Sequence, residues 1–215
     1  MIKKLQALKK KKGFTLVELI VVIAIIGVLA AILVPTMMGY VTSSRITSLN
    51  STAASIKNNI DSFLTTADTK GYGMLKGSSN STEVKISIDA SGKWDITDVD
   101  DSKFKTGGSL QWGGSGSGAA AGDKSQASHA EDLLAIELAD LFPTVKNAYV
   151  WAYLEGGKCL YVYYTEDSTS APTGAPAKTD FDNGVFSWDT STAGITSDGM
   201  SVGTAPALDL GSANP

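Results

Sequence analysis

Residues 9 to 35 read KKKKGFTLVELIVVIAIIGVLAAILVP, and this stretch decides the fold because it is long and apolar enough to cross a membrane. From Leu19 to Val34, sixteen consecutive residues are uncharged and nearly all are apolar. Glu18 is the one charged residue between Phe14 and Tyr40. A membrane-spanning helix needs about 20 predominantly apolar residues. The stretch therefore predicts a membrane helix with a single carboxylate near its start.

Basic residues before the apolar run predict its orientation. They are Lys3, Lys4, Lys9, Lys10, Lys11 and Lys12. Because basic segments stay on the cytoplasmic side of a membrane, we expect the chain after the helix to lie outside the cytoplasm. Without these six lysines, the 18 basic residues fall to 12 against 22 acidic residues. The exported part is thus acidic, and we expect no direct nucleic-acid binding by a single subunit.

An amphipathic pattern follows the apolar segment. Its apolar residues recur in steps of three and four, at Ile46, Leu49, Ala53, Ile56, Ile60 and Phe63. This spacing is typical of one face of a helix, and Gly71 and Gly73 end the pattern. We therefore expect one helix from Phe14 to about Lys70, whose first half is transmembrane and whose second half packs on the rest of the chain.

Downstream of this helix, the sequence predicts an α+β head. Residues 83–96 alternate in the manner of two strands joined by a turn, and residues 107–122 have the composition of a flexible loop. Ser128 and Glu131 have the spacing of a capping box, and the short helix that they begin is expected to end before Pro143.

The clearest strand signal is AYVWAYLEGGKCLYVYY, residues 148–164, in which two apolar runs flank a Gly-Gly pair. Glycines suit a tight hairpin turn because they adopt positive φ angles readily. The predicted pairs are Glu155 with Lys158, Leu154 with Cys159, and Trp151 with Val162. In this register one face carries Tyr149, Trp151, Tyr153, Leu160, Val162 and Tyr164, and the other carries Val150, Ala152, Leu154, Cys159, Tyr161 and Tyr163.

Both faces of this hairpin are apolar, so each needs a cover. We expect the long helix on one face, and the short helix or the C-terminal segment on the other. Residues 168–178 are expected to be a linker, and residues 182–188 to form another turn and strand. The tail beyond Ala193 is rich in Gly, Ser and Thr.

The segment KKKKGFTLVELIVVIAIIGVLAAILVP resembles the processing and assembly segment of type IV pilins and pseudopilins. The resemblance rests on a basic leader that ends in Gly13, on Phe14 as the next residue, and on Glu18 four positions later. An uninterrupted apolar helix with Pro35 in its second half completes it, so that it covers about residues 14–40. It implies a pilin-like fold, in which the long helix packs on an antiparallel sheet.

The resemblance also implies roles for individual residues. A membrane prepilin peptidase would cut between Gly13 and Phe14 and would methylate the new amino group of Phe14. Glu18 would pair with the Phe14 amine of a neighbouring subunit as the helices leave the lipid and form a filament core. The alternative is that Glu18 stays hydrated near the lipid headgroups.

Two further residues of the apolar helix are candidate assembly residues. Gly27 shares a face of small residues with Ala24 and Ala31, which would allow close packing of helices between subunits. Pro35 removes a helix hydrogen bond and is expected to bend or loosen the helix. Both features are also compatible with an ordinary membrane helix, which tolerates glycine and proline.

The sequence contains few of the residue types that catalytic and metal sites require. His129 is the only histidine and Cys159 the only cysteine, so zinc sites, disulfides and Ser-His-Asp triads lack their components. We expect no enzyme, no metal and no cofactor. His129 is interpreted as a surface residue of a first helical turn, and Cys159 as a packed side chain in a strand.

Three other patterns are candidates for binding or modification. The acidic residues Asp95, Asp98, Asp100 and Asp101 could gather calcium ligands, but they lack the spacing of an EF-hand, and a solvated loop is favoured. Four aromatic residues could form a sugar-binding surface, although core packing is favoured: Tyr149, Trp151, Tyr153 and Tyr161. The triplets at 50–52 and 80–82 match a glycosylation sequon, and neither is assigned a glycan.

The sequence thus predicts the structural subunit of a type IV pilus filament, with leader 1–13, assembly helix 14–40, helical continuation 41–70 and exported head 71–215. One alternative is a pseudopilin of a type II secretion or competence system. Another, from a different class, is a monomeric single-span membrane protein with a ligand-binding head.

The resemblance implies the partners and location of such a subunit. Its partners would be other copies of the chain, prepilin peptidase, and the pilus assembly platform with its ATPase. The precursor would lie in the cytoplasmic membrane with its head outside, and the mature protein in a filament on the cell surface.

Overall fold

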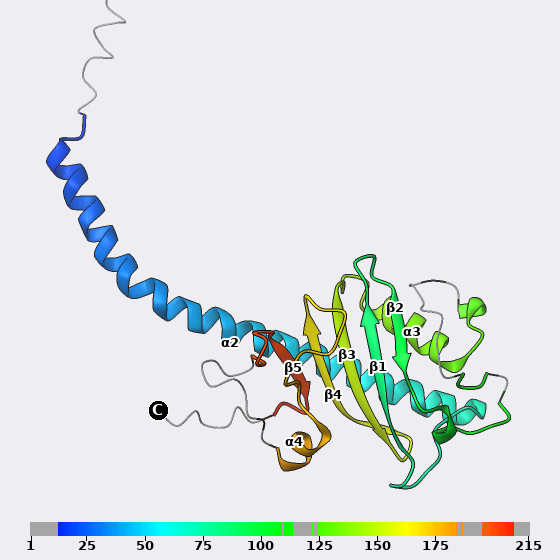
Figure 1. Cartoon of the computed structure of the whole chain (residues 1–215). Coiled ribbons are helices and arrows are strands. Elements are labelled where there is room, and N and C mark those ends of the chain that lie inside the picture. The colour runs from blue at the N-terminus through cyan, green and yellow to red at the C-terminus, as the bar shows by residue number, and fades with distance from the viewer. Residues whose placement is uncertain are drawn as a thin grey trace, which may run out of the picture. The chain divides into compact units, whose positions relative to one another are not determined.

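The structure is a computed structural model that describes residues 13–108, 110–113, 122, 124–184, 186 and 195–208. The leader lysines and part of the strand expected at 182–188 lie outside the described residues. In chain order the elements are α2 (Leu16–Lys70), β1 (Ser81–Ile88), β2 (Trp94–Asp98), η2 (Asp101–Lys103), η3 (Lys124–Gln126), α3 (Ala130–Leu141), β3 (Ala148–Glu155), β4 (Lys158–Glu166), α4 (Lys178–Asn183) and β5 (Val202–Ala205) (Figure 1). The chain divides into two compact units between Thr42 and Ser43.

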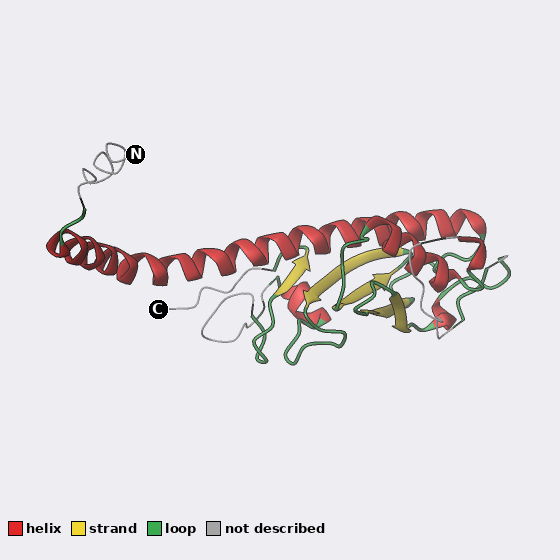
Figure 2. Cartoon of the chain, turned by 90° about the horizontal axis from the view of Figure 1, so that it is seen from above, coloured by secondary structure: helices red, strands yellow, loops and turns green. Residues whose placement is uncertain are grey.

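The amphipathic face predicted for the second half of α2 is confirmed. It lies along one face of the sheet (Figure 2), and its buried members are Ile46, Leu49, Ala53, Ile56, Ile60, Phe63, Leu64 and Ala67. The helix ends at Lys70 because Gly71 adopts a φ of 89°. The N–H of Tyr72 then donates to the carbonyl of Ala67 at 3.2 Å, and the N–H of Gly71 to that of Asp68 at 3.3 Å. This pair of bonds is a Schellman motif, which satisfies the last carbonyls of the helix.

The head contains a five-stranded antiparallel sheet in the order β2-β1-β3-β4-β5. The predicted α+β fold with its long N-terminal helix is therefore confirmed. The main core lies between this sheet and α2, and it includes the fully buried Ile56, Ile60, Trp94 and Leu134. Since Leu134 belongs to α3, both helices pack on the same face of the sheet.

The hairpin of β3 and β4 follows the predicted register only near its turn. Glu155 faces Lys158 and Leu154 faces Cys159, as expected, but Trp151 faces Tyr163 instead of Val162. A β-bulge after the first pairs inserts one extra residue into β4, and it reverses the orientation of the residues beyond it. Val162 and Tyr164 therefore join the core beneath α2, whereas Tyr163 packs on the opposite face.

The C-terminal segment covers the second face of the sheet. A cluster of aromatic and apolar side chains forms this layer, and its buried members are Tyr149, Trp151, Tyr153, Tyr163, Phe181, Phe186, Val202 and Leu208. The rings of Trp151 and Phe181 are stacked with centroids 5.8 Å apart. Of the two covers considered, the C-terminal segment is thus the correct one. The turn expected in residues 182–188 occurs at Gly184, which ends α4 with a φ of 69°, and most of the strand expected after it lies outside the described residues.

Strand β5 approaches α2 unusually closely. The backbone of Gly203 lies against that of Leu49 and Asn50, with no room for a Cβ atom. The side-chain oxygen of Asn50 accepts a hydrogen bond of 2.7 Å from the N–H of Thr204. This bond occupies a backbone donor that an edge strand otherwise leaves free to pair with another chain.

The start of α3 is capped differently from the prediction. His129 is the N-cap residue, and its N–H donates to Asp132 Oδ2 at 3.0 Å, as does the N–H of Ser128 at 3.1 Å. Glu131 is buried and accepts from the N–H of Gly113 at 2.8 Å instead. The expected box of Ser128 with Glu131 is therefore wrong by one residue.

Cys159 is buried, in agreement with its interpretation as a packed side chain. Burial raises the pKa of its thiol from 9.0 to about 12. Because the thiolate is the reactive form, we expect no labelling of the folded protein by a thiol reagent at pH 8, and one equivalent after denaturation. Rapid labelling of the folded chain would contradict this, and Ser91→Cys in an exposed turn is the matched positive control.

Candidate assembly site

The N-terminal half of α2 has an exposed apolar surface, and the contact of such a surface with water is energetically unfavourable. Its large apolar side chains range from 46% exposed at Val22 to 76% at Tyr40, and Phe14, just before the helix, is 85% exposed. By length and composition, α2 is sufficient to cross a membrane. Exposed apolar patches of this extent mark surfaces that contact lipid or another protein.

A capping box closes the N-terminus of this helix. The N–H and hydroxyl of Thr15 donate to Glu18 Oε2 at 2.8 and 2.7 Å, and the N–H of Glu18 donates to Thr15 Oγ1 at 3.2 Å. The helix begins at Leu16, two residues after the predicted start, because Thr15 serves as its cap. The signal for this cap is present in the sequence as TLVE, residues 15–18, in which Glu follows Thr by three positions.

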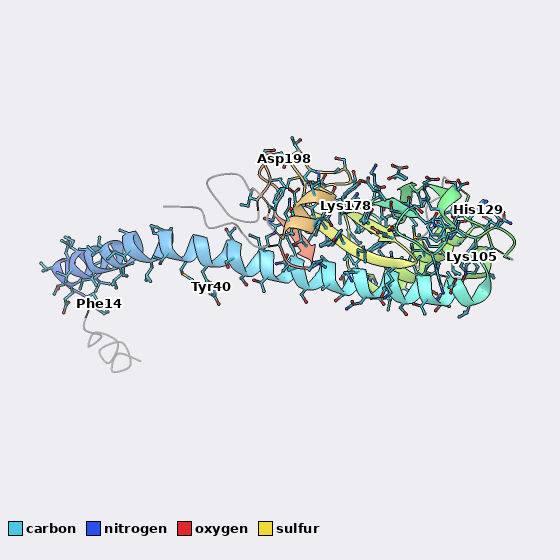
Figure 3. The ribbon with its side chains drawn as sticks, turned by 90° about the horizontal axis from the view of Figure 1, so that it is seen from below. Phe14, Tyr40, Lys105, His129, Lys178 and Asp198 are labelled. Atoms are coloured by element: carbon cyan, nitrogen blue, oxygen red, sulfur yellow. The ribbon has the colours of Figure 1, made fainter. Side chains whose placement is uncertain are left out.

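The capping box orients the carboxylate of Glu18 toward the end of the helix. Oε2 is occupied by Thr15, and no hydrogen bond to Oε1 occurs among the described residues. Gly13 and Phe14 precede the helix, and both are exposed; Phe14 lies at the start of the described chain (Figure 3). The Gly13–Phe14 peptide bond is thus accessible, and a carboxylate with one free oxygen lies a single helical turn away.

The other two predicted site residues lie further along the helix. At about 1.5 Å per residue, Gly27 and Pro35 are about 14 and 26 Å from Glu18. A side chain added at Gly27 would meet nothing within 4 Å, so its surface is open to a neighbour. The helix continues without interruption through Pro35, and the hydroxyl of Thr36 donates to the carbonyl of Leu33 at 2.9 Å.

The remaining candidate residues serve local structure. Asp100 Oδ1 accepts from the N–H of Ser102 at 3.0 Å, and Asp98 pairs with Lys85 at 2.7 Å. No group of three or more metal-ligating side chains occurs within the described part of the chain. His129 has a half-exposed side chain and acts as the N-cap of α3. The four aromatic residues considered for sugar binding belong to the apolar layer on the second face of the sheet.

Comparisons with known proteins agree with this architecture. Residues 8–34 match the family described as "Prokaryotic N-terminal methylation motif". An exposed apolar helix that carries this motif and continues into the core of an antiparallel head defines the class of type IV pilin-like proteins. Within that class, the chain belongs to the family described as "Domain of unknown function (DUF5021)", whose model matches residues 46–209.

Several curated relatives are fimbrial proteins. The chain is 39% identical over 82 residues to "Fimbrial protein Q" of Moraxella bovis, which covers 38% of this chain and 50% of the relative. It is 46% identical over 54 residues to the "Type IV major alpha-pilin" of Moraxella bovis, 25% and 34% of the two chains. "Type IV major fimbrial protein FimA" of Dichelobacter nodosus is 41% identical over 54 residues, 25% and 34% of the two chains. The chain thus spans a third to half of these relatives, and no solved structure matches it significantly.

Proposed function

We propose that the chain is the precursor of a structural subunit of a type IV pilus filament. The observation that carries the proposal is the exposed apolar half of α2 together with the capped Glu18 that follows the accessible Gly13–Phe14 bond. The family match over residues 8–34 and the names of the relatives support the same role. The work of such a subunit is structural.

Processing divides the precursor into parts with separate roles. Prepilin peptidase removes the leader 1–13 and methylates the amino group of Phe14. Residues 14–40 anchor the precursor in the cytoplasmic membrane and then assemble, residues 41–70 continue the helix, and residues 71–215 form the head outside the cytoplasm. Assembly also requires the pilus platform and its ATPase.

Glu18 pairs with the Phe14 amine of the adjacent subunit in the filament. A charged carboxylate near the end of a membrane helix is costly without a partner. The ammonium group of the cleaved Phe14 also needs an oppositely charged partner when it is buried. Their pairing neutralises both groups as each helix exchanges lipid for copies of itself. Thr15 holds Glu18 Oε2, which leaves Oε1 for the incoming amine.

Gly27 and Pro35 adapt the helix to the filament core. The open surface at Gly27 allows a neighbouring helix to approach closely. Pro35 lacks the N–H that would bond to the carbonyl of Ala31, so this turn is the weakest of the apolar segment and yields first when helices repack.

The N-terminal residue of the exported protein tests the proposal. We expect mass spectrometry of sheared surface filaments from the native host to find N-methylated Phe14 as the first residue, because the matched motif is one of N-terminal methylation and the resemblance to pilins implies cleavage after Gly13. Electron microscopy of the same preparation should show filaments whose main subunit is this chain. An intact Met1 on a protein that stays in the membrane as a monomer would instead support a single-span anchor.

A further inference from the structure

A groove on the head lies between α2 and the β4–β5 end of the sheet. Its volume is about 400 Å³ and its lining is mostly apolar. Its lining includes Ala54, Lys57 and Asn58 of α2, Leu160 and Tyr161 of β4, and Pro206 after β5. Neither the packing of the head nor the processing of the N-terminus requires this groove.

Leu141, the last residue of α3, is an exposed apolar side chain of the head. It is 55% exposed, although its neighbours on α3 are mostly buried. Among the large apolar residues described after Thr42, Leu75 is the other exposed one, at 38%. An exposed leucine at the end of a helix is a projection that an apolar groove accommodates.

The projection and the groove lie at opposite ends of the sheet. Helix α3 packs beside β2, whereas the groove adjoins β5, and these two strands are the outer strands of the sheet (Figure 1). Leu141 therefore cannot enter the groove of its own chain. Two copies that repeat head to tail can join the two surfaces, and such a heterologous contact builds an open helical filament.

The charges around the two surfaces are also complementary. Helix α3 contains no basic residue, and Asp140 lies immediately before Leu141. The groove carries Lys57, and Lys158 begins the adjoining strand. Among the described residues, neither lysine forms an ion pair within the chain. Opposite charges around an apolar contact fix its register and exclude other partners.

We propose that Leu141 of one copy inserts into the groove of the next copy, with Asp140 facing Lys57. The occupant of the groove is thus a second copy of this chain. The inference rests on the proposed function, because it requires a filament, and it adds a contact between heads to the packing of the apolar helices.

A charge exchange in the full-length chain tests this contact. Leu141→Lys places a cation against Lys57, and Ala54→Glu places an anion against Asp140, so each single variant should reduce the number of sheared filaments about tenfold or more. The double variant should restore filaments, because every copy then presents the new lysine to a new glutamate. Leu75→Lys is the matched control, and it should leave the filament number unchanged.

Folding is measured in parallel. Residues 54 and 141 are exposed, and surface substitutions change stability by about 0.5 kcal/mol or less, so thermal unfolding of all four variants should resemble that of the unsubstituted chain. A covalent test uses Leu141→Cys with Asn58→Cys, which should yield a ladder of cross-linked multimers in oxidised filaments. Cys159 does not interfere because it is buried.

Each result has a separate meaning. Unchanged filament numbers for Leu141→Lys, or a double variant as defective as the single ones, would overturn the head contact and leave the proposed function intact. Failure of the unsubstituted chain to form filaments with the complete assembly machinery would overturn both.

Discussion

Glu18→Gln is expected to abolish most filaments while the subunit still folds and enters the membrane. Glutamine supports a capping box as glutamate does, so the start of α2 should be retained. The lost charge leaves the Phe14 ammonium unpaired in the filament core. Removal of one partner of a buried ion pair costs about 3–5 kcal/mol, which corresponds to a factor of about 10² to 4 × 10³ in subunit addition.

Filament counts by electron microscopy and subunit levels in the membrane fraction measure this effect. Thr15→Ala is the matched control, because it removes the cap and keeps the charge. Loss of an N-cap costs about 1 kcal/mol, so this variant should retain filaments. Abundant normal filaments from Glu18→Gln would contradict the proposed ion pair.

Gly203→Ala is expected to destabilise the head strongly. The added Cβ would lie 2.5 Å from the backbone nitrogen of Asn50 and closer still to the carbonyl group of Leu49. Neither backbone can rotate away as a side chain could, so β5 or α2 must shift. We expect a loss of about 3 kcal/mol in the free energy of unfolding, the upper part of the range for overpacking.

Thermal unfolding of the full chain in detergent, followed by tryptophan fluorescence, measures this loss. For a chain of this size, about 3 kcal/mol lowers Tm by about 6–12 °C. Gly39→Ala adds the same methyl group in α2, where it meets nothing within 4 Å, and should not lower Tm. An unchanged Tm for Gly203→Ala would mean that β5 does not lie against α2 as the structure shows.

The stability of the head should also fall at alkaline pH. The pKa of Cys159 in the folded protein lies above its ordinary value of 9.0 because of burial. The unfolded chain therefore loses the thiol proton first, and stability decreases as pH rises above about 9. Cys159→Ser should reduce this slope in denaturant titrations between pH 9 and 11, and an identical slope would assign it to other groups.

Much of the candidate site was predictable because its determinants are local. Gly13, Phe14 and Glu18 lie close together in sequence, at the start of the helix, so their arrangement needs no distant contact. Thr15 was missed although its spacing from Glu18 is a known capping signal. Its role in orienting the carboxylate was therefore available from the sequence.

The sequence by itself determined the long helix, its apolar and amphipathic halves, and the turn of the β3–β4 hairpin, since each depends on the period of neighbouring side chains. Only the tertiary structure decided the bulge in β4, the cover provided by Phe181 and Leu208, and the approach of Gly203 to α2. These features depend on contacts between residues that are far apart along the chain, where packing outweighs local preference.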